Sequence, residues 1–191
     1  MMFGLFKKKE DRATLRKPTS WLFGALGGTR VSSGVVVNES TALQYSAVYA
    51  AVRLLSESVA SLPLHTYERL DEGKQRAYGH PVAGMLSTSV NPQLSSYGFR
   101  ETLMGHVLTY GNGYAEIVRD GAGNPVQLLP ITPDRVSVEQ ESDGTIRYRV
   151  DEQITLSQDD MFHIAGLGFD GLVGYSPVTL AKQSVGLGLG A

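Results

Sequence analysis

The chain has 191 residues, a formal net charge of −2, 42% hydrophobic and 19% charged residues. This composition is typical of a globular domain and excludes an intrinsically disordered chain. The absence of cysteine excludes disulfide bonds, a thiolate nucleophile and a zinc–thiolate site, and no stretch supplies the roughly 18 uncharged apolar residues of a membrane-spanning helix.

Positive charge is concentrated at the N-terminus. Residues 1–17 carry six Lys or Arg against Glu10 and Asp11, a local charge of +4, so the remainder of the chain carries about −6. Such a body does not neutralise many phosphates, which argues against tight, sequence-independent binding of DNA. Residues 1–9 combine apolar side chains with three lysines, so they either contact an anionic membrane surface or form a solvated terminus.

Residues 1–38 are predicted to form a flexible N-terminal arm, and residues 39–191 a single α+β domain. The arm contains the only tryptophan, Trp21, next to Leu22 and Phe23, and glycines and serines follow without a sustained hydrophobic period. A tryptophan in such a stretch usually packs on another surface. That surface is either a neighbouring subunit or the chain's own domain.

The first predicted helix spans 41–61, because its hydrophobic residues repeat at steps of three and four. Ser40 or Thr41 is placed to cap its start, and Pro63 to end it. Alanines and serines cover its other faces, which favours close packing on two sides. The stripe consists of Val48, Val52, Leu55, Val59 and Leu62. If this stripe is buried, Leu55→Ala costs about 2–5 kcal/mol.

The middle of the chain is predicted to contain short elements and a second amphipathic helix. Strands are predicted at 64–70 and 74–78, a short helix from His80-Pro81 to about residue 87, and a loop at Asn91-Pro92. The second helix spans 96–110, and Gly111 is placed for its left-handed C-terminal residue. Its stripe consists of Phe99, Leu103, Val107 and Tyr110.

The period then changes to two, and short turns connect the apolar segments, which predicts an antiparallel β meander. The predicted strands lie at 113–119, 126–131, 135–140, 145–150 and 161–165. Ser176-Pro177 predicts the start of a final helix, because serine caps and proline opens helices. This helix runs into Ala191 without a cap or a partner, so the domain is expected to be incomplete at its C-terminus.

The motif Gly166-Leu167-Gly168-Phe169-Asp170-Gly171 matches the dinucleotide-binding pattern G-x-G-x-x-G. A dinucleotide site needs a helix that opens at the motif, so that its amides meet the pyrophosphate. The predicted helix starts several residues too late, and Asp170 would repel phosphate. A mobile or subunit-contacting loop is therefore the main interpretation, and a nucleotide-binding enzyme using Gly166–Gly171 is kept as an alternative.

Other catalytic templates are absent from the sequence. It has no Walker, nucleophile-elbow or H-E-x-x-H motif, and its four histidines do not pair at metal-ligand spacing. The acidic pairs fall at predicted turns rather than across a cleft. We therefore expect no catalytic, cofactor-binding or metal-binding residues, no cofactor and no enzymatic activity, and we assign no residue to nucleic-acid contact.

Several stretches together resemble the HK97-type family of tailed-phage portal proteins. They are AVYAAVRLLSESVASLPLHTYER (47–69), HP (80–81), NP (91–92), FRETLMGHVLTYGNGYAEIVRDGAGNPVQLLPITPDRVSV (99–138) and HIAGLGFDGLVGYSPVTLAKQSVGLGLGA (163–191). Each piece alone is an ordinary helix, hairpin or loop, but their order and spacing make the combination specific. The likeness covers about residues 40–191.

The resemblance implies a virion protein: a subunit of a homododecameric ring at the unique capsid vertex, assembled in the bacterial cytoplasm. Such a ring is a conduit for viral genome packaging and DNA ejection, so double-stranded DNA passes through it without sequence-specific binding. It is also a head–tail connector that docks the terminase large subunit, major capsid or scaffold protein and head-completion or adaptor proteins. The chain resembles the outer wing of such a subunit, and a truncated prophage remnant without ring function is a further alternative.

Overall fold

The computed structural model describes residues 36–168 and 170–190. Most of the predicted arm, 1–38, therefore lies outside the described residues. Its last residues belong to the fold, because Val37 is only 1% exposed and packs with Ala42, Val178 and Val185. Within the described ranges no helix is both long enough and apolar enough to cross a bilayer.

The predicted helix at 41–61 is two helices, α2 (Glu39–Ala42) and α3 (Ser46–Ala60). The expected cap at Ser40 or Thr41 is wrong, because Asn38 caps α2 through its side chain. Its Oδ1 accepts from the Thr41 N–H at 2.8 Å, while Thr41 Oγ1 accepts from the Asn38 N–H at 2.9 Å. This reciprocal capping box satisfies two donors at the start of α2. Helix α3 ends at Ala60, before Pro63 as predicted.

The second long helix, α5 (Ser96–Tyr110), has the predicted bounds. The Ser95 side chain accepts from the Gly98 N–H at its start, and Gly111 closes it with a φ of +85°. The shorter elements before it also follow the prediction, with β3 and β4 added as a hairpin around Asn91-Pro92. They are β1 (Tyr67–Arg69), β2 (Lys74–Arg76), α4 (Pro81–Ser87), β3 (Ser89–Asn91) and β4 (Leu94–Ser95).

The later strands form two separate three-stranded antiparallel sheets rather than one meander. The first has the order β10-β5-β6, from β5 (Asn112–Arg119), β6 (Pro125–Ile131) and β10 (Met161–Ala165). The second has the order β7-β8-β9, from β7 (Val136–Gln140), β8 (Ile146–Val150) and β9 (Ile154–Ser157). A 3₁₀ turn, η1 (Pro133–Arg135), connects β6 to β7. The sequence did not predict β9, because its turn uses Asp151 and Glu152 at positive φ rather than glycine.

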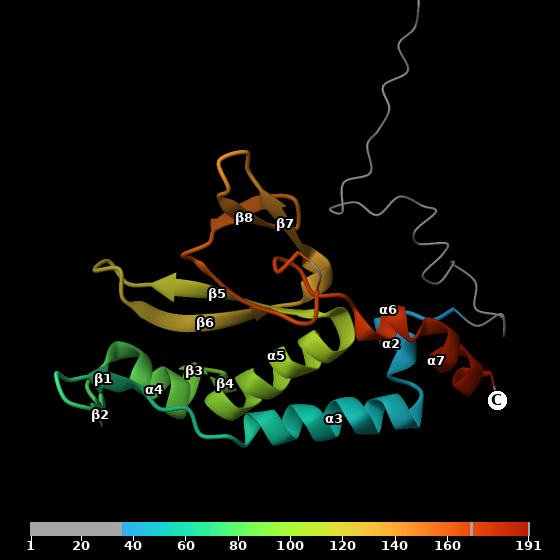
Figure 1. Ribbon diagram of the computed structural model, residues 1–191, viewed down its shortest axis with the longest axis horizontal. Helices are drawn as coiled ribbons and strands as arrows, with labels where there is room; N and C mark the ends of the chain where they lie inside the picture. Colours follow the sequence, from blue (N-terminus) through green and yellow to red (C-terminus); the bar gives the residue numbers. More distant parts are fainter. Residues whose placement is uncertain (1–35, 169, 191) are drawn as a thin grey trace, which may run out of the picture.

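The molecule has the mixed α+β organisation that the sequence predicted, with its layers one above another (Figure 1). The β7-β8-β9 sheet lies at the top, β5 and β6 in the middle, and α5 and α3 below. Helices α2, α6 (Pro177–Leu180) and α7 (Lys182–Leu189) gather at one end, and the β1–β2 hairpin projects from the other. The hydrophobic core between α5 and the first sheet contains Met85, Val90, Phe99, Leu103, Ala115 and Leu128.

Candidate functional site

The glycine-rich loop after β10 uses its backbone amides within the protein. The N–H groups of Leu172 and Val173 donate to Asp170 Oδ1 at 2.9 and 3.0 Å. The Gly174 N–H donates to Asn112 Oδ1, and the Gly166 N–H to the Gly111 carbonyl, each at 2.8 Å. A phosphate-binding loop needs such amides free for its ligand, so these contacts disfavour a nucleotide site.

The glycines allow segments of backbone to pass very close to one another at the end of α5. A Cβ added to Gly174 would stand 2.6 Å from the Gly166 nitrogen and nearer still to the Gly111 carbonyl oxygen. A Cβ on Gly166 would stand 2.8 Å from that same oxygen. Real Cβ atoms do not approach backbone so closely, and glycine is the residue that permits it. Helix α6 begins only at Pro177, after this crossing.

Beneath the loop lies a cluster of four polar and aromatic side chains: Asn112, Tyr114, Tyr148 and His163. Besides accepting from Gly174, the Asn112 amide donates to the Gly174 carbonyl at 2.9 Å. His163 Nε2 lies 3.1 Å from Asn112 Oδ1, and its Nδ1 lies 3.2 Å from the Tyr148 hydroxyl. An amide oxygen only accepts, so Nε2 carries the hydrogen and Nδ1 of the neutral ring accepts from Tyr148.

The environment of this cluster keeps it uncharged. Burial lowers the pKa of His163 to about 4, and the Tyr114 ring stacks on the imidazole with centroids 4.4 Å apart. Burial also raises the pKa of Tyr114 and, less strongly, of Tyr148. Neutral groups that satisfy one another hold the loop in place. His163 is thus a strand residue with a structural role, and no group of three or more His, Cys, Asp or Glu within the described ranges is arranged to hold a metal.

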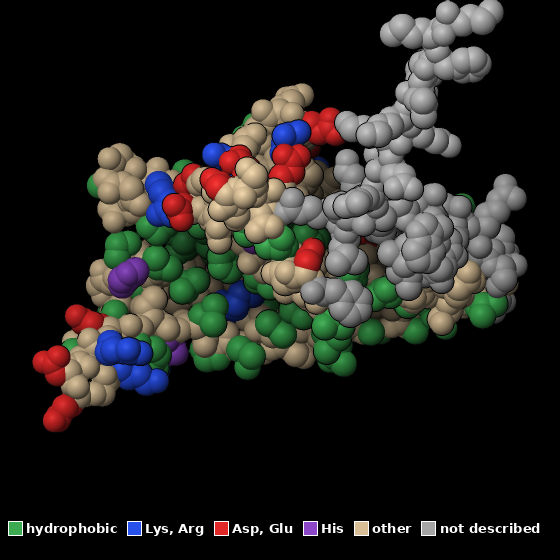
Figure 2. Space-filling model, turned by 45° about the horizontal axis from the view of Figure 1, so that its top comes forward, with side chains coloured by type: hydrophobic (Ala, Val, Ile, Leu, Met, Phe, Trp, Pro, Cys, Tyr) green, Lys and Arg blue, Asp and Glu red, His purple; other side chains and the backbone are tan. Residues whose placement is uncertain are grey.

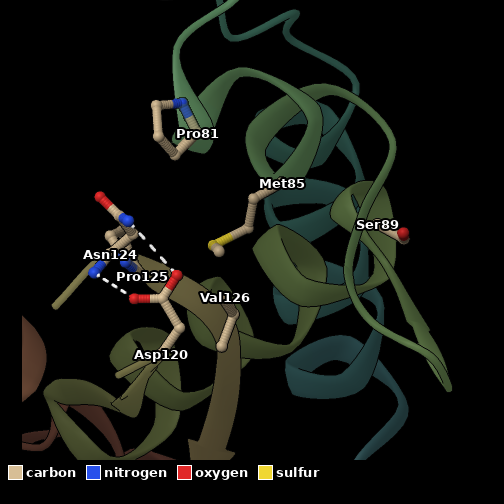
Figure 3. Close-up of a pocket in the computed structure, with 7 residues that line it drawn as sticks. All are labelled: Pro81, Met85, Ser89, Asp120, Asn124, Pro125 and Val126. Carbon is tan, nitrogen blue, oxygen red and sulfur yellow. Dashed lines mark hydrogen bonds between the residues drawn. The ribbon is translucent and has the colours of Figure 1, made fainter. Parts of the chain in front are cut away.

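A hollow of about 420 Å³ lies between α4 and the β5–β6 turn (Figure 3). Asp120 lines it, with its carboxylate directed at its own turn. It accepts from the backbone N–H groups of Ala122 and Asn124 at 2.9 and 2.8 Å, and these bonds lower its pKa, with the Asn124 contacts the largest cause. Asp120 is therefore a turn-forming residue, and Met85 supplies the apolar floor.

A strongly hydrophobic hollow, of about 230 Å³, lies between α3, α5 and β10 and is called here the α3–α5–β10 groove. Apart from Ser96 and Arg100, every residue that lines it is hydrophobic. The groove is lined by Val59, Leu62, Leu64, Leu86, Ser96, Phe99, Arg100, Leu103, Met104, Val107, Phe162 and Ile164. Figure 2 shows hydrophobic side chains along the middle and lower part of the molecule, where α3 and α5 lie.

The groove exists because α3 turns its small residues, not its apolar stripe, toward α5. Ser56 and Ala60 are buried, whereas Leu55 is 49% exposed and Leu62 60% exposed. The predicted burial of the stripe is therefore wrong for its C-terminal half. The cause is the close approach of the two helices: the Ser56 hydroxyl lies 3.8 Å from the place that a Cβ on Gly105 would take. Small residues of both helices therefore meet at this crossing.

Arg100 fixes the two helices at the floor of the groove. Its Nε and Nη2 donate to the Ala60 carbonyl at 3.0 and 2.7 Å, at the last turn of α3. Its Nη1 donates to the Leu86 carbonyl at 3.1 Å and to Ser96 Oγ at 2.5 Å. A cation at a helix C-terminus is favourable because the last carbonyls carry partial negative charge.

Comparisons with known proteins identify what this chain is similar to. The model of the family described as phage portal protein matches residues 46–191. The portal protein of Enterobacteria phage HK97 is 36% identical over 155 residues, covering 79% of this chain and 37% of the relative. The probable portal protein of Streptomyces phage phiC31 is 31% identical over 180 residues, covering 86% and 38%. The chain thus spans well under half the length of these two phage relatives.

Solved structures with a similar fold come from particle necks and a portal protein. A chain in the neck of an empty GTA particle, computed with C6 symmetry, has a TM-score of 0.64 and 25% identity over 88% of this chain and 48% of its own length. An HK97 family phage portal protein from Corynebacterium diphtheriae has a TM-score of 0.55 and 18% identity over 79% and 46%, a likeness of fold alone.

Proposed function

The chain belongs to the phage portal protein family, and from this premise we propose that it is part of a structural subunit of the portal ring at the unique capsid vertex. The observation that carries the proposal is the family match over 46–191, which runs from the start of α3 through both sheets to the end of the chain. The fold supports it, because a chain in a particle neck has a similar fold over 88% of this chain.

The surface of the described residues fits a structural role. A closed ring needs two different surface patches on each subunit, so that one copy contacts the next head to tail. Large hydrophobic side chains of α3 outside the groove, Tyr49, Leu54 and Leu55, are exposed, which is typical of contact surfaces. In the Gly166–Gly171 loop and the residues after it, backbone amides donate to other groups of the protein, and the glycines allow backbone segments to pass close together. We therefore propose a structural protein without enzymatic activity of its own.

The ring would act as a conduit for DNA during packaging and ejection. The chain outside residues 1–17 carries about −6, so its net charge would repel a passing duplex rather than bind it, and it would hold no particular DNA sequence. The proposed protein partners are further copies of the chain, the terminase large subunit, the major capsid or scaffold protein, and a head-completion or adaptor protein. The proposed location is the virion vertex, after assembly in the host cytoplasm.

The stoichiometry of the complete gene product that contains this chain tests the proposal. Native mass spectrometry and electron microscopy should show a ring, and twelve subunits is the expected number because a neck related in fold was computed with C12 symmetry. A protein that stays strictly monomeric from low to high salt would overturn the proposal. Co-purification with a terminase large subunit produced in the same cells tests the partner assignment separately.

A further inference from the structure

The α3–α5–β10 groove has the size and chemistry to receive an aromatic side chain. Its volume is about 230 Å³, whereas an engineered apolar cavity of roughly 150 Å³ already binds benzene. Phe99 and Phe162 stand in its wall with ring centroids 6.1 Å apart, and Met104 lines it beside them. Aromatic rings pack favourably on other rings and on thioether sulfur.

The cation in the groove lining also favours an aromatic occupant. Arg100 is held by the Ala60 and Leu86 carbonyls and by Ser96 Oγ, so its charge stays fixed in an otherwise apolar wall. A guanidinium beside a ring gains a cation–π attraction, which is strongest for tryptophan. An aliphatic segment would gain nothing from Arg100, so the lining selects for an aromatic one.

The chain contains such a segment before Val36, the first described residue. Trp21, the only tryptophan, is followed by Leu22 and Phe23, and the sequence from there to Val36 is rich in glycine and serine. The three side chains offer one large ring, one aliphatic group and a second ring. They match a groove whose lining is almost wholly hydrophobic.

The distance from Val36 to the groove is within reach of this segment. Val36 lies thirteen positions after Phe23, and an extended chain of thirteen residue steps spans about 43–47 Å. Val37 packs beside Val48 in the first half of α3, and Val59 lines the groove eleven residues further along the helix, which is about 17 Å. A Gly/Ser-rich connection of this length has a typical end-to-end distance of about 18–22 Å. Linkers are most effective when this length matches the span.

We propose that Trp21-Leu22-Phe23 occupies the α3–α5–β10 groove of its own chain, with the Trp21 ring between Phe99, Phe162 and Arg100. The segment covers Val59, Leu62 and Ile164, which are otherwise exposed. This inference concerns the single chain and does not depend on ring formation. Its failure would leave the family membership and the proposed function untouched.

The single tryptophan makes the proposal directly measurable in the full 191-residue chain. Trp21 fluorescence should have the short-wavelength emission of a buried indole, and acrylamide should quench it much less than it quenches free tryptophan. Val59→Asp puts a charge into the groove wall at a side chain that is 39% exposed, so the fold should persist. In this variant the emission should move to that of a water-exposed indole, and quenching should rise to match.

Two controls make every outcome decisive. Ile154→Asp, at a 57% exposed position in β9 of the other sheet, should leave Trp21 emission unchanged. Leu62→Asp, at a 60% exposed groove position, replaces Val59→Asp if circular dichroism shows that the latter is unfolded. Solvent-exposed emission in the unmodified chain, or buried emission that survives both groove variants, overturns the proposal. Burial that appears only as protein concentration rises also overturns it, because the occupant would then come from a second copy.

Discussion

Helices α3 and α5 are equal in length, and each carries a hydrophobic stripe in the sequence, yet the fold treats them differently. In α5 the stripe residues Phe99 and Leu103 are 4% and 2% exposed and form the core. In α3 the large residues Leu54 and Leu55 are 65% and 49% exposed, while Ser56 and Ala60 are buried. Periodicity locates the apolar side of a helix, but the partner at the crossing decides which side is covered.

The physical cause of the difference is that α5 has the sheet on one side and α3 on the other. Its large side chains fill the space below β5 and β6, and the face that remains for α3 carries Gly105 and Arg100. Small residues of α3 bring the two backbones close together, so that Arg100 reaches the Ala60 carbonyl at the C-terminal end of α3. The large residues of α3 are then left facing outward and into the groove.

The largest expected effect comes from the centre of α5. Leu103→Ala would remove a side chain that is 2% exposed and packed with Phe99, Ala115 and Leu128. The free energy of unfolding should fall by about 2–5 kcal/mol, because a buried cavity is added to the lost hydrophobic transfer energy. Urea unfolding followed by circular dichroism measures this change. A loss below about 1 kcal/mol would break the contrast between the two helices.

The crossing at the C-terminus of α5 should be next in sensitivity. Gly174→Ala would push a methyl group against the Gly111 carbonyl and the Gly166 nitrogen. Since both neighbours are backbone, the strain should cost about 1–3 kcal/mol. Gly121→Ala is the matched control, because nothing lies within 4 Å of the position of its Cβ. Equal midpoints of thermal unfolding for the two variants would show that close approach does not explain the glycines.

The half-buried His163 of β10 should produce a smaller, pH-dependent effect. The pKa of His163 is about 4 in the folded protein and about 6.5 when unfolded. The unfolded chain therefore takes up a proton first, and stability should be unaffected above pH 6.5 and fall as the pH drops from 6.5 to 4. After allowance for partial exposure the loss is about 1–2 kcal/mol. His163→Gln should flatten this part of the stability–pH curve, and an unchanged slope would assign it to other groups.

The smallest effect is expected on the outer face of α3. Leu55→Ala should cost about 1 kcal/mol or less, because half of the side chain remains in water. This replaces the 2–5 kcal/mol that burial of the whole stripe would imply. The same unfolding experiment as for Leu103→Ala measures it, so the pair forms an internal comparison. A cost equal to that of Leu103→Ala would mean that Leu55 is covered in solution.

The elements whose bounds depend on nearby residues could be predicted from the sequence. Helix α5 has the expected bounds because Ser95 caps it and Gly111 ends it, and both signals lie within the chain segment that they control. The helix start at Ser176-Pro177 follows for the same reason. The break between α2 and α3 was not predicted, and the residue at the break, Tyr45, lies against Gly188, which is distant in the sequence.

The candidate sites show the same division between local and distant information. The sequence argued against a nucleotide site at Gly166–Gly171 from the late helix start, and the structure adds that Asn112, 62 residues from Gly174, takes up its amide and carbonyl. The groove was not predicted, because its lining combines α3, α5 and β10. The signal for the groove in the sequence was that α3 carries many large hydrophobic residues, while small residues occupy its other faces.

The β1–β2 hairpin has a consequence for how the protein would respond to solvent and proteases. Every residue of both strands is exposed, and a two-stranded hairpin on its own is only marginally stable in water. Its amide hydrogens should exchange before those of β5 and α5, and among the residues that the structure describes trypsin should cut first beside Arg69, Lys74 or Arg76. The tight turn at Gly73, with a φ of +83° and nothing within 4 Å of its Cβ position, is then the place where an inserted peptide tag would disturb the rest of the molecule least.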